Sequence, residues 1–82
     1  GGDYEKGKRY FENAIEFSED QNLNAKVEYA LSYARPLYDR ELHDKLLQEV
    51  ISSNPVNKNY TLLNVIAKEQ ASSMLEDADE YF

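Results

Sequence analysis

The sequence predicts an all-α fold of antiparallel helical hairpins, with about four helices in residues 1–82. Apolar residues recur at steps of three and four, the spacing that places them on one face of a helix. Polar or proline-containing breaks separate these stretches. No stretch sustains a period-two alternation, and the sequence has no Asn-Gly or Asp-Gly hairpin turn, so we expect no strands.

The first half of the chain is predicted to form two helices, the first capped by Asp3. Its apolar stripe comprises Tyr4, Gly7, Phe11, Ala14 and Ser18, widened by Tyr10 and Phe17. After a polar break at residues 18–22, the stripe of the second helix comprises Leu23, Val27, Ala30, Leu31 and Ala34. Pro36 lacks an N–H and disfavours helical geometry at Arg35, so the second helix should kink or end near there.

The second half is predicted to form two further helices, of which Asp39 can cap the first. That helix carries Leu42, Leu46, Leu47, Val50 and Ile51 on one face and stops at residues 52–55, which include Pro55. The last helix starts near Asn59, and its stripe comprises Leu63, Ile66, Ala67, Gln70, Ala71, Met74, Leu75 and Ala78. Acidic residues at the end of this helix oppose its dipole, so residues 79–82 are expected to fray.

Composition restricts the classes of function. Apolar residues make up 41% and charged residues 30% of the chain, a balance typical of a folded globular protein. Acidic residues outnumber basic ones by 16 to 9, and the net charge of -7 repels phosphate backbones. We therefore expect no nucleic-acid partner. The absence of cysteine excludes disulfides, thiolate metal sites and thiol nucleophiles within these residues.

Helical hairpins in series suggest a repeat, and the TPR unit of about 34 residues is the natural template. Residues 2–6 resemble the turn that opens the second helix of a TPR, and Pro55 matches the closing proline of the next unit. Val27, Leu31 and His43 replace an aromatic residue, a glycine and a small residue of that motif. We therefore predict one TPR-like helical domain over residues 1–82, with helices packed farther apart than in a regular TPR; a plain four-helix bundle is the alternative.

A longer set of motifs carries a more specific resemblance. These motifs are NAKVEYA at 24–30, YAR at 33–35, DRELHDKLLQEV at 39–50, NVIA at 64–67 and DEYF at 79–82. Together they resemble the T component of the tripartite ATP-independent periplasmic (TRAP) transporters, a bacterial TPR-like family. The motifs correspond to the C-terminal part of such a protein, so we expect the chain to be a C-terminal fragment.

The resemblance implies a helical protein of the bacterial periplasm that associates with a TRAP solute-binding protein and holds or passes an apolar ligand. It also implies a parent protein anchored as a lipoprotein, through a cysteine that would precede Gly1. None of these properties follows from the helical periodicity itself.

Four residues around the end of the second helix are the candidates for a binding site: Tyr29, Tyr33, Arg35 and Tyr38. A tyrosine offers apolar area and one hydroxyl at low entropy cost, which suits a binding groove. An arginine near a broken helix end can bind a carboxylate of a ligand or partner. The alternative is that the tyrosine rings pack between helices and that Arg35 and Arg40 pair with acids such as Asp39 and Glu41.

The sequence indicates no catalytic or metal site, and we expect no cofactor. His43 is the only histidine, and no serine lies in a nucleophile-elbow context, so His43 is expected to be structural or exposed. The acidic residues 76–80 lack the ligand spacing and central glycine of a calcium loop. A solvated terminus is the expected role of this segment.

The leading functional hypothesis is therefore a non-catalytic accessory component of a TRAP-type uptake system, which docks a solute-binding protein and encloses an apolar ligand. The alternative is a generic TPR-like scaffold that binds peptides or self-associates as a homo-oligomer, because a free repeat end exposes an apolar face. An enzyme is disfavoured because no paired catalytic groups appear.

Overall fold

The computed structural model describes the backbone of residues 2–57 and 59–82, and it describes the side chains of these residues from Tyr4 onward. Its elements are α1 (Gly2–Phe17), α2 (Leu23–Tyr29), the π-helix η1 (Ala30–Ala34), α3 (Arg40–Ser52), α4 (Thr61–Glu76) and α5 (Ala78–Tyr81). No strand occurs in the described residues. The all-α prediction is therefore confirmed.

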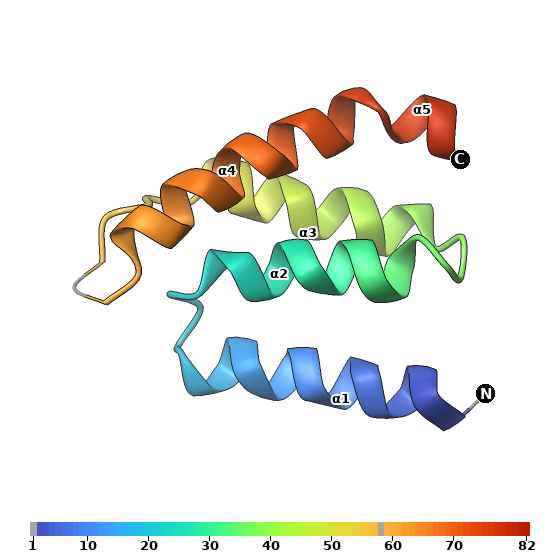
Figure 1. The fold of residues 1–82 in the computed structure, drawn as a ribbon, viewed down its shortest axis with the longest axis horizontal. Helices are drawn as coiled ribbons and strands as arrows, with labels where there is room; N and C mark the ends of the chain where they lie inside the picture. Colours follow the sequence, from blue (N-terminus) through green and yellow to red (C-terminus); the bar gives the residue numbers. More distant parts are fainter. Residues whose placement is uncertain (1, 58) are drawn as a thin grey trace.

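The four long helical segments, α1, the helix formed by α2 and η1, α3 and α4, run in alternating directions, as the hairpin prediction required (Figure 1). α2 lies in the middle and packs against α1, α3 and α4, and η1 continues α2 and packs against α1 and α3. The assembly is flat, with extents of 36 × 28 × 15 Å. Assignment of these hairpins to TPR units remains a prediction.

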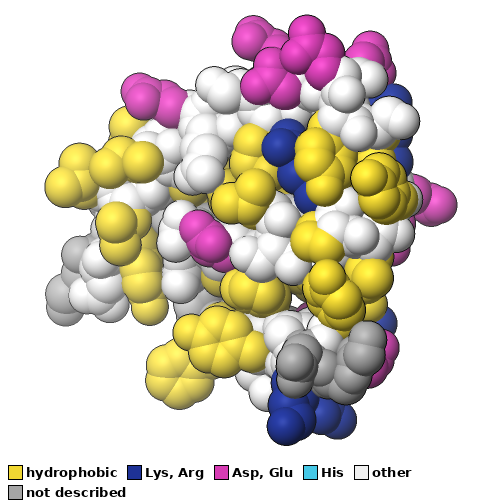
Figure 2. Space-filling model, turned by 45° about the vertical axis from the view of Figure 1, so that its right-hand side comes forward, with side chains coloured by type: hydrophobic (Ala, Val, Ile, Leu, Met, Phe, Trp, Pro, Cys, Tyr) yellow, Lys and Arg dark blue, Asp and Glu magenta, His cyan; other side chains and the backbone are white. Residues whose placement is uncertain are grey.

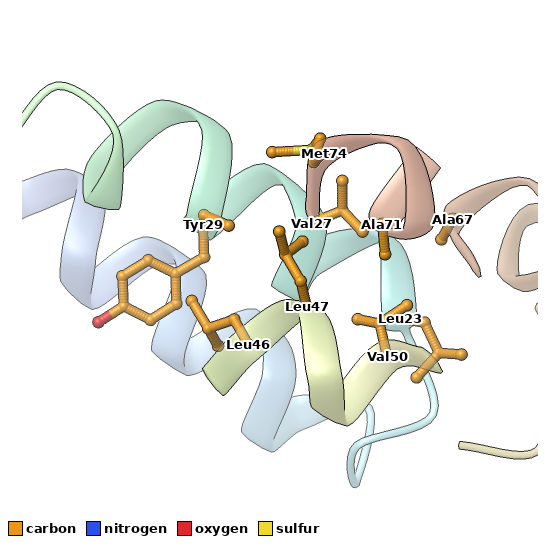
Figure 3. Close-up of a cluster of buried hydrophobic side chains, with 10 residues drawn as sticks. Leu23, Val27, Tyr29, Leu46, Leu47, Val50, Ala67, Ala71 and Met74 are labelled. Carbon is orange, nitrogen blue, oxygen red and sulfur yellow. The ribbon is translucent and has the colours of Figure 1, made fainter. Parts of the chain in front are cut away.

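The buried core lies between α2, α3 and α4 (Figure 3). Its members are Leu23, Val27, Tyr29, Ala30, Leu46, Leu47, Val50, Ala67, Ala71 and Met74. Each of the larger aliphatic side chains contributes about 1.5 to 3 kcal/mol by leaving water. The small side chains come mainly from α4, which lets that helix lie close to α2 and α3.

Several residues predicted to be buried are exposed instead. Tyr10 and Phe17 on α1 are 69% and 90% exposed, because α1 lies at one edge of the assembly and packs against α2 and η1 on one side. Leu63 and Ile66 are 52% and 51% exposed, because the beginning of α4 extends past the neighbouring helices (Figure 1). Leu31 also faces outward. The periodicity predicted the helices correctly, but it assigned too many residues to their buried faces.

The predicted helix boundaries are largely confirmed. The Asp39 carboxylate accepts the N–H of Leu42 at 3.1 Å, so it caps α3 as expected. The helix formed by α2 and η1 ends at Ala34, next to the predicted break. The backbone of Asp3 lies inside α1, and the predicted cap by its side chain lies outside the described part of the chain.

The expectation of a frayed C-terminus is wrong. Residues 78–81 form α5, Ala78 is buried, and the Phe82 ring lies 4.9 Å from the His43 ring. The acidic side chains of this segment are exposed to solvent as expected, but the aromatic residues that follow them hold the terminus in place. None of the described helices has the length and apolarity that crossing a membrane requires.

Candidate functional site

The structure divides the four candidate residues into two neighbouring groups. Tyr29 and Tyr33 lie between α1 and the helix formed by α2 and η1, with their rings 5.4 Å apart. Arg35 and Tyr38 lie in the turn that joins η1 to α3, where they contact the C-terminal residues. The break at Pro36 separates the two groups, so the four side chains do not share one groove.

The first group is an aromatic cluster that fastens α1 to the rest of the protein. Phe11 stacks on Tyr29 at 5.7 Å, and Tyr4 meets the edge of Tyr33 at 6.5 Å. Tyr29 is only 4% exposed, and its hydroxyl points away from the buried cluster (Figure 3). The rings therefore pack between helices, as the alternative interpretation predicted, and Tyr29 still reaches a surface groove through its hydroxyl.

The hydroxyl of Tyr29 donates a hydrogen bond to the Glu12 carboxylate at 3.3 Å. Burial raises the pKa of this hydroxyl, and the charge of Glu12 and its hydrogen bond raise the pKa further. The hydroxyl consequently stays protonated at neutral pH and holds the Glu12 carboxylate at the edge of the groove.

This groove has a volume of about 440 Å³ and lies between α1, α2 and α3. Its apolar lining consists of Ile15, Tyr29, Leu42 and Leu46. Its charged lining consists of Glu12, Glu16, Asp20, Glu49, Lys26 and Lys45. A groove with an apolar floor and a charged rim can hold the apolar part of a small molecule and orient a polar group.

The second group belongs to a larger surface that we call the corner patch: Arg35, Leu37, Tyr38, Arg40, Tyr81 and Phe82. Arg35 and Phe82 are half-buried, and the other four residues are exposed. In Figure 2, with this end of the molecule turned forward, hydrophobic and basic side chains lie next to one another below a group of acidic side chains. The guanidinium of Arg35 lies 4.8 Å from the centre of the Tyr81 ring, a cation–π distance.

Arg35 also anchors the corner patch to the core. Its Nε donates to Nε2 of His43 at 3.0 Å, and its Nη2 donates to the carbonyl of Met74 at 3.3 Å. Neither Asp39 nor Glu41 forms an ion pair with it among the described residues, so that predicted pairing of Arg35 is wrong. The partners that Arg35 has instead, a histidine ring and a backbone carbonyl, cannot be predicted from the residues next to it in the sequence.

Arg40, in contrast, pairs with acids as predicted. Its guanidinium bonds to Asp44 at 3.3 Å and also to Asp79. The hydrogen bonds to Asp79 and Asp44 raise the pKa of Arg40 above its ordinary value. The Asp79 contact ties α5 to the beginning of α3.

Tyr38 is the most unusual residue of the corner patch. Its φ of 55° lies in the left-handed region, which costs an L-residue about 1 to 2 kcal/mol. Its side chain is 70% exposed, and its ring stacks on Tyr81 at 5.9 Å. The N–H groups of Tyr38 and Asp39 donate to the carbonyls of Arg35 and Ala34 at 3.0 and 2.9 Å, so Tyr38 occupies the left-handed position of a helix C-cap. Glycine is the usual residue there, and this chain instead presents a large exposed aromatic side chain.

His43 is fully buried and has a structural role. Arg35 can only donate, so Nε2 accepts its hydrogen bond and Nδ1 carries the proton that bonds to Asp44 at 2.9 Å. Both ring nitrogens are therefore engaged. Within the described ranges, no group of three histidine or acidic side chains is arranged to hold a metal ion.

Sequence reasoning missed most of the groove. Its lining comes from three helices and, through Asp20, from the loop after α1, and only Tyr29 was a candidate. One signal was present: Glu12 and Glu16 lie one turn apart beside the stripe of α1. Periodicity assigns such residues to a solvated face, and the packing of α1 and α3 on either side of α2 is what makes them a rim.

Comparison with known families matches the TRAP transporter T-component over residues 1–82. The chain belongs to this family. The suspected resemblance is therefore confirmed, and membership implies a role as a component of a bacterial TRAP transporter, in association with other transporter proteins. No curated protein and no solved structure matches this T-component.

Proposed function

We propose that this T-component is a non-catalytic accessory protein that docks the TRAP solute-binding protein through the corner patch. The observation that carries the proposal is Tyr38, an exposed aromatic side chain kept at a positive φ of 55°. A glycine or asparagine would fit this backbone with less strain. The cap hydrogen bonds hold the backbone here, and what distinguishes Tyr38 is a large aromatic side chain exposed at a position that usually carries glycine.

The composition of the corner patch supports a protein partner. Tyrosine and arginine are enriched among residues that dominate binding energy, and two of each lie here around the exposed Leu37. Arg40 is paired with Asp44 and Asp79, whereas Arg35 forms no ion pair among the described residues. Arg35 is therefore the basic group of the patch that a polar or acidic group of a partner would complement.

We further propose that the groove between α1, α2 and α3 receives the apolar part of a ligand, with Tyr29 in its lining. Its volume of about 440 Å³ falls within the range of small-molecule sites. Tyr33 supports this site through its contact with Tyr29. Family membership favours the bacterial periplasm as the compartment and a lipid-anchored parent protein.

The docking proposal is tested by titrating the cognate solute-binding protein into the wild type and into Tyr38→Ala by calorimetry. Loss of the ring should weaken binding roughly tenfold or more. Tyr10→Ala is the matched control, since Tyr10 and Tyr38 are 69% and 70% exposed. Circular dichroism should show intact helicity in both variants; equal affinity for wild type and Tyr38→Ala would remove the corner patch as the docking surface.

Self-association is the second candidate function, and one observation favours it. The beginning of α4 exposes a group of apolar side chains: Leu62, Leu63, Val65 and Ile66. No charged residue lies within this stretch, so two copies of a chain of net charge -7 could meet here with the least repulsion. Sedimentation at several concentrations should show a dimer or larger species that Leu62→Glu abolishes; a monomer throughout would exclude this function.

A further inference from the structure

We infer that the groove between α1, α2 and α3 selects amphiphilic cations, with an apolar chain on its floor and an ammonium group at Glu12 and Glu16. This inference rests on the proposal that the groove holds an apolar ligand, and it adds the chemical class of the head group. Three features of the groove support it: the balance of charge, the pairing of its lysines and the position of Glu12.

The charged lining holds four carboxylates and two ammonium groups, so it has an excess of two negative charges. Lys26 is the most buried of these groups, with a side chain 10% exposed. It lies 3.8 Å from Asp20 and 3.5 Å from Glu49, and these two carboxylates neutralise it. They are therefore less available to a ligand than the carboxylates of α1.

Glu12 and Glu16 are the carboxylates on the α1 side of the groove, one helical turn apart. Like charges at this spacing repel each other by about 0.2 to 0.5 kcal/mol. A cation bound between them would remove this repulsion and gain attraction from both. Lys45 is the remaining positive group of the lining, and it belongs to α3, across the groove from α1.

The Tyr29 hydroxyl fixes the position of one of these carboxylates. It donates to Glu12 at 3.3 Å from a residue that is only 4% exposed. The anchored carboxylate shares the groove with the apolar floor formed by Ile15, Leu42 and Leu46. A ligand with an apolar chain and a positive head can therefore use both parts of the lining at once.

A carboxylate head group fits this lining poorly. It would meet the excess negative charge, and the buried Lys26 is already neutralised by Asp20 and Glu49. Displacing these partners would leave two carboxylates uncompensated beside the ligand. The groove should thus distinguish head groups of opposite charge on the same alkyl chain.

The experiment titrates decylammonium, decanoate and the neutral 1-decanol into the ¹⁵N-labelled chain at pH 7 and low salt, below the concentration at which any of them aggregates. The expected result is saturable shifts for decylammonium at residues lining the groove, with weaker binding of decanol and weakest binding of decanoate. The double variant Glu12→Gln, Glu16→Gln should weaken decylammonium binding roughly five- to tenfold.

The control is Glu5→Gln, Glu69→Gln, which removes two exposed carboxylates that lie outside the groove, one on α1 and one on α4. It changes the net charge by the same amount as the groove variant, so it separates a local effect from a general electrostatic one. It should change the affinity less than about twofold, because solvent and salt screen distant exposed charges.

Several outcomes would overturn the inference. Equal or tighter binding of decanoate, equal binding of all three probes, or no binding of any probe would do so. Equal losses of decylammonium affinity in the two double variants would overturn it too, because the attraction would then come from the net charge of the chain.

Docking of the solute-binding protein is measured in parallel with the same variants. If decylammonium fails to bind while Tyr38-dependent docking persists, only the inference on the ligand class is lost. If decylammonium binds the groove and docking fails at the corner patch, the ligand site stands and the docking proposal falls.

Discussion

The two ends of the helix assembly use their polar and aromatic residues in different ways. At one end, which we call the loop end, the loop segments 18–22 and 53–57 meet, and Asn64 joins them. At the other end lies the corner patch, with exposed tyrosines around two arginines. At the loop end a buried side chain makes the internal hydrogen bonds, whereas the internally bonded arginines of the corner patch hold exposed aromatic side chains at the surface.

Asn64 and Lys68 supply several of the internal bonds at the loop end. The Asn64 side chain is 1% exposed; it accepts the N–H of Leu23 at 3.0 Å and donates to the carbonyls of Gln21 at 2.8 Å and Pro55 at 3.2 Å. Lys68 donates to the last carbonyls of α3, including that of Val50 at 3.4 Å. These bonds hold the two loop segments and the end of α3 against α4.

The largest expected effect comes from breaking the loop end. Asn64→Ala should lower the free energy of unfolding by about 3 kcal/mol, because it leaves a buried N–H and two carbonyls without partners. Urea denaturation measures this loss. Asn59→Ala, at an exposed asparagine in the same region, should change stability by less than about 0.5 kcal/mol, and similar losses in both variants would contradict the role given to Asn64.

A smaller effect is expected where the corner patch is anchored. Phe82→Ala removes a ring whose centroid lies 4.9 Å from that of the His43 ring and 6.3 Å from that of the Tyr38 ring. It should therefore destabilise the protein by about 1 to 2 kcal/mol. Thermal unfolding followed by circular dichroism measures the change. Phe17→Ala is the control, since Phe17 is 90% exposed; a smaller loss for Phe82→Ala than for Phe17→Ala would show that the terminus is not anchored.

The smallest expected effect concerns backbone strain, which occurs at both ends. Glu19, in the loop that follows α1, has a φ of 54°, close to the 55° of Tyr38. Glu19→Gly should raise the free energy of unfolding by about 0.5 kcal/mol, since the relief of strain exceeds the extra entropy of the unfolded chain. Its affinity for the solute-binding protein should equal that of the wild type. Weaker docking by this variant would place part of the docking surface at the loop end and contradict its assignment to the corner patch.

Most of the fold could be predicted from the sequence because its signals are local. Asp39, Pro36 and Pro55 act on the backbone within a few residues of themselves, and the structure places helix boundaries beside each of them. The exposure of Phe17 and Leu63 could not be predicted, because it depends on which neighbouring helix covers a given face. A terminus anchored by Phe82 on His43 is likewise a contact between residues far apart in sequence.

The candidate site was predictable only in part for the same reason. Tyr29, Tyr33, Arg35 and Tyr38 lie near the break at Pro36, and the sequence placed them close together along the chain. Their division into two groups depends on the direction in which the chain leaves Ala34. The role of Glu12 in the groove depends on the packing of α1 beside α2, which brings the Glu12 carboxylate to the Tyr29 hydroxyl.

The π-helical turn at Ala30–Ala34 sets the orientation of the residues that follow it. Arg35 donates its N–H group to the carbonyl five residues earlier, that of Ala30, at 3.0 Å. A turn closed in this way holds about one residue more than an α-turn, and one residue corresponds to a rotation of about 100°. Deleting one residue between 30 and 34 would rewind the segment into a regular α-helix. The Arg35 side chain would then point away from His43, and the exposed Tyr38 would face a different direction.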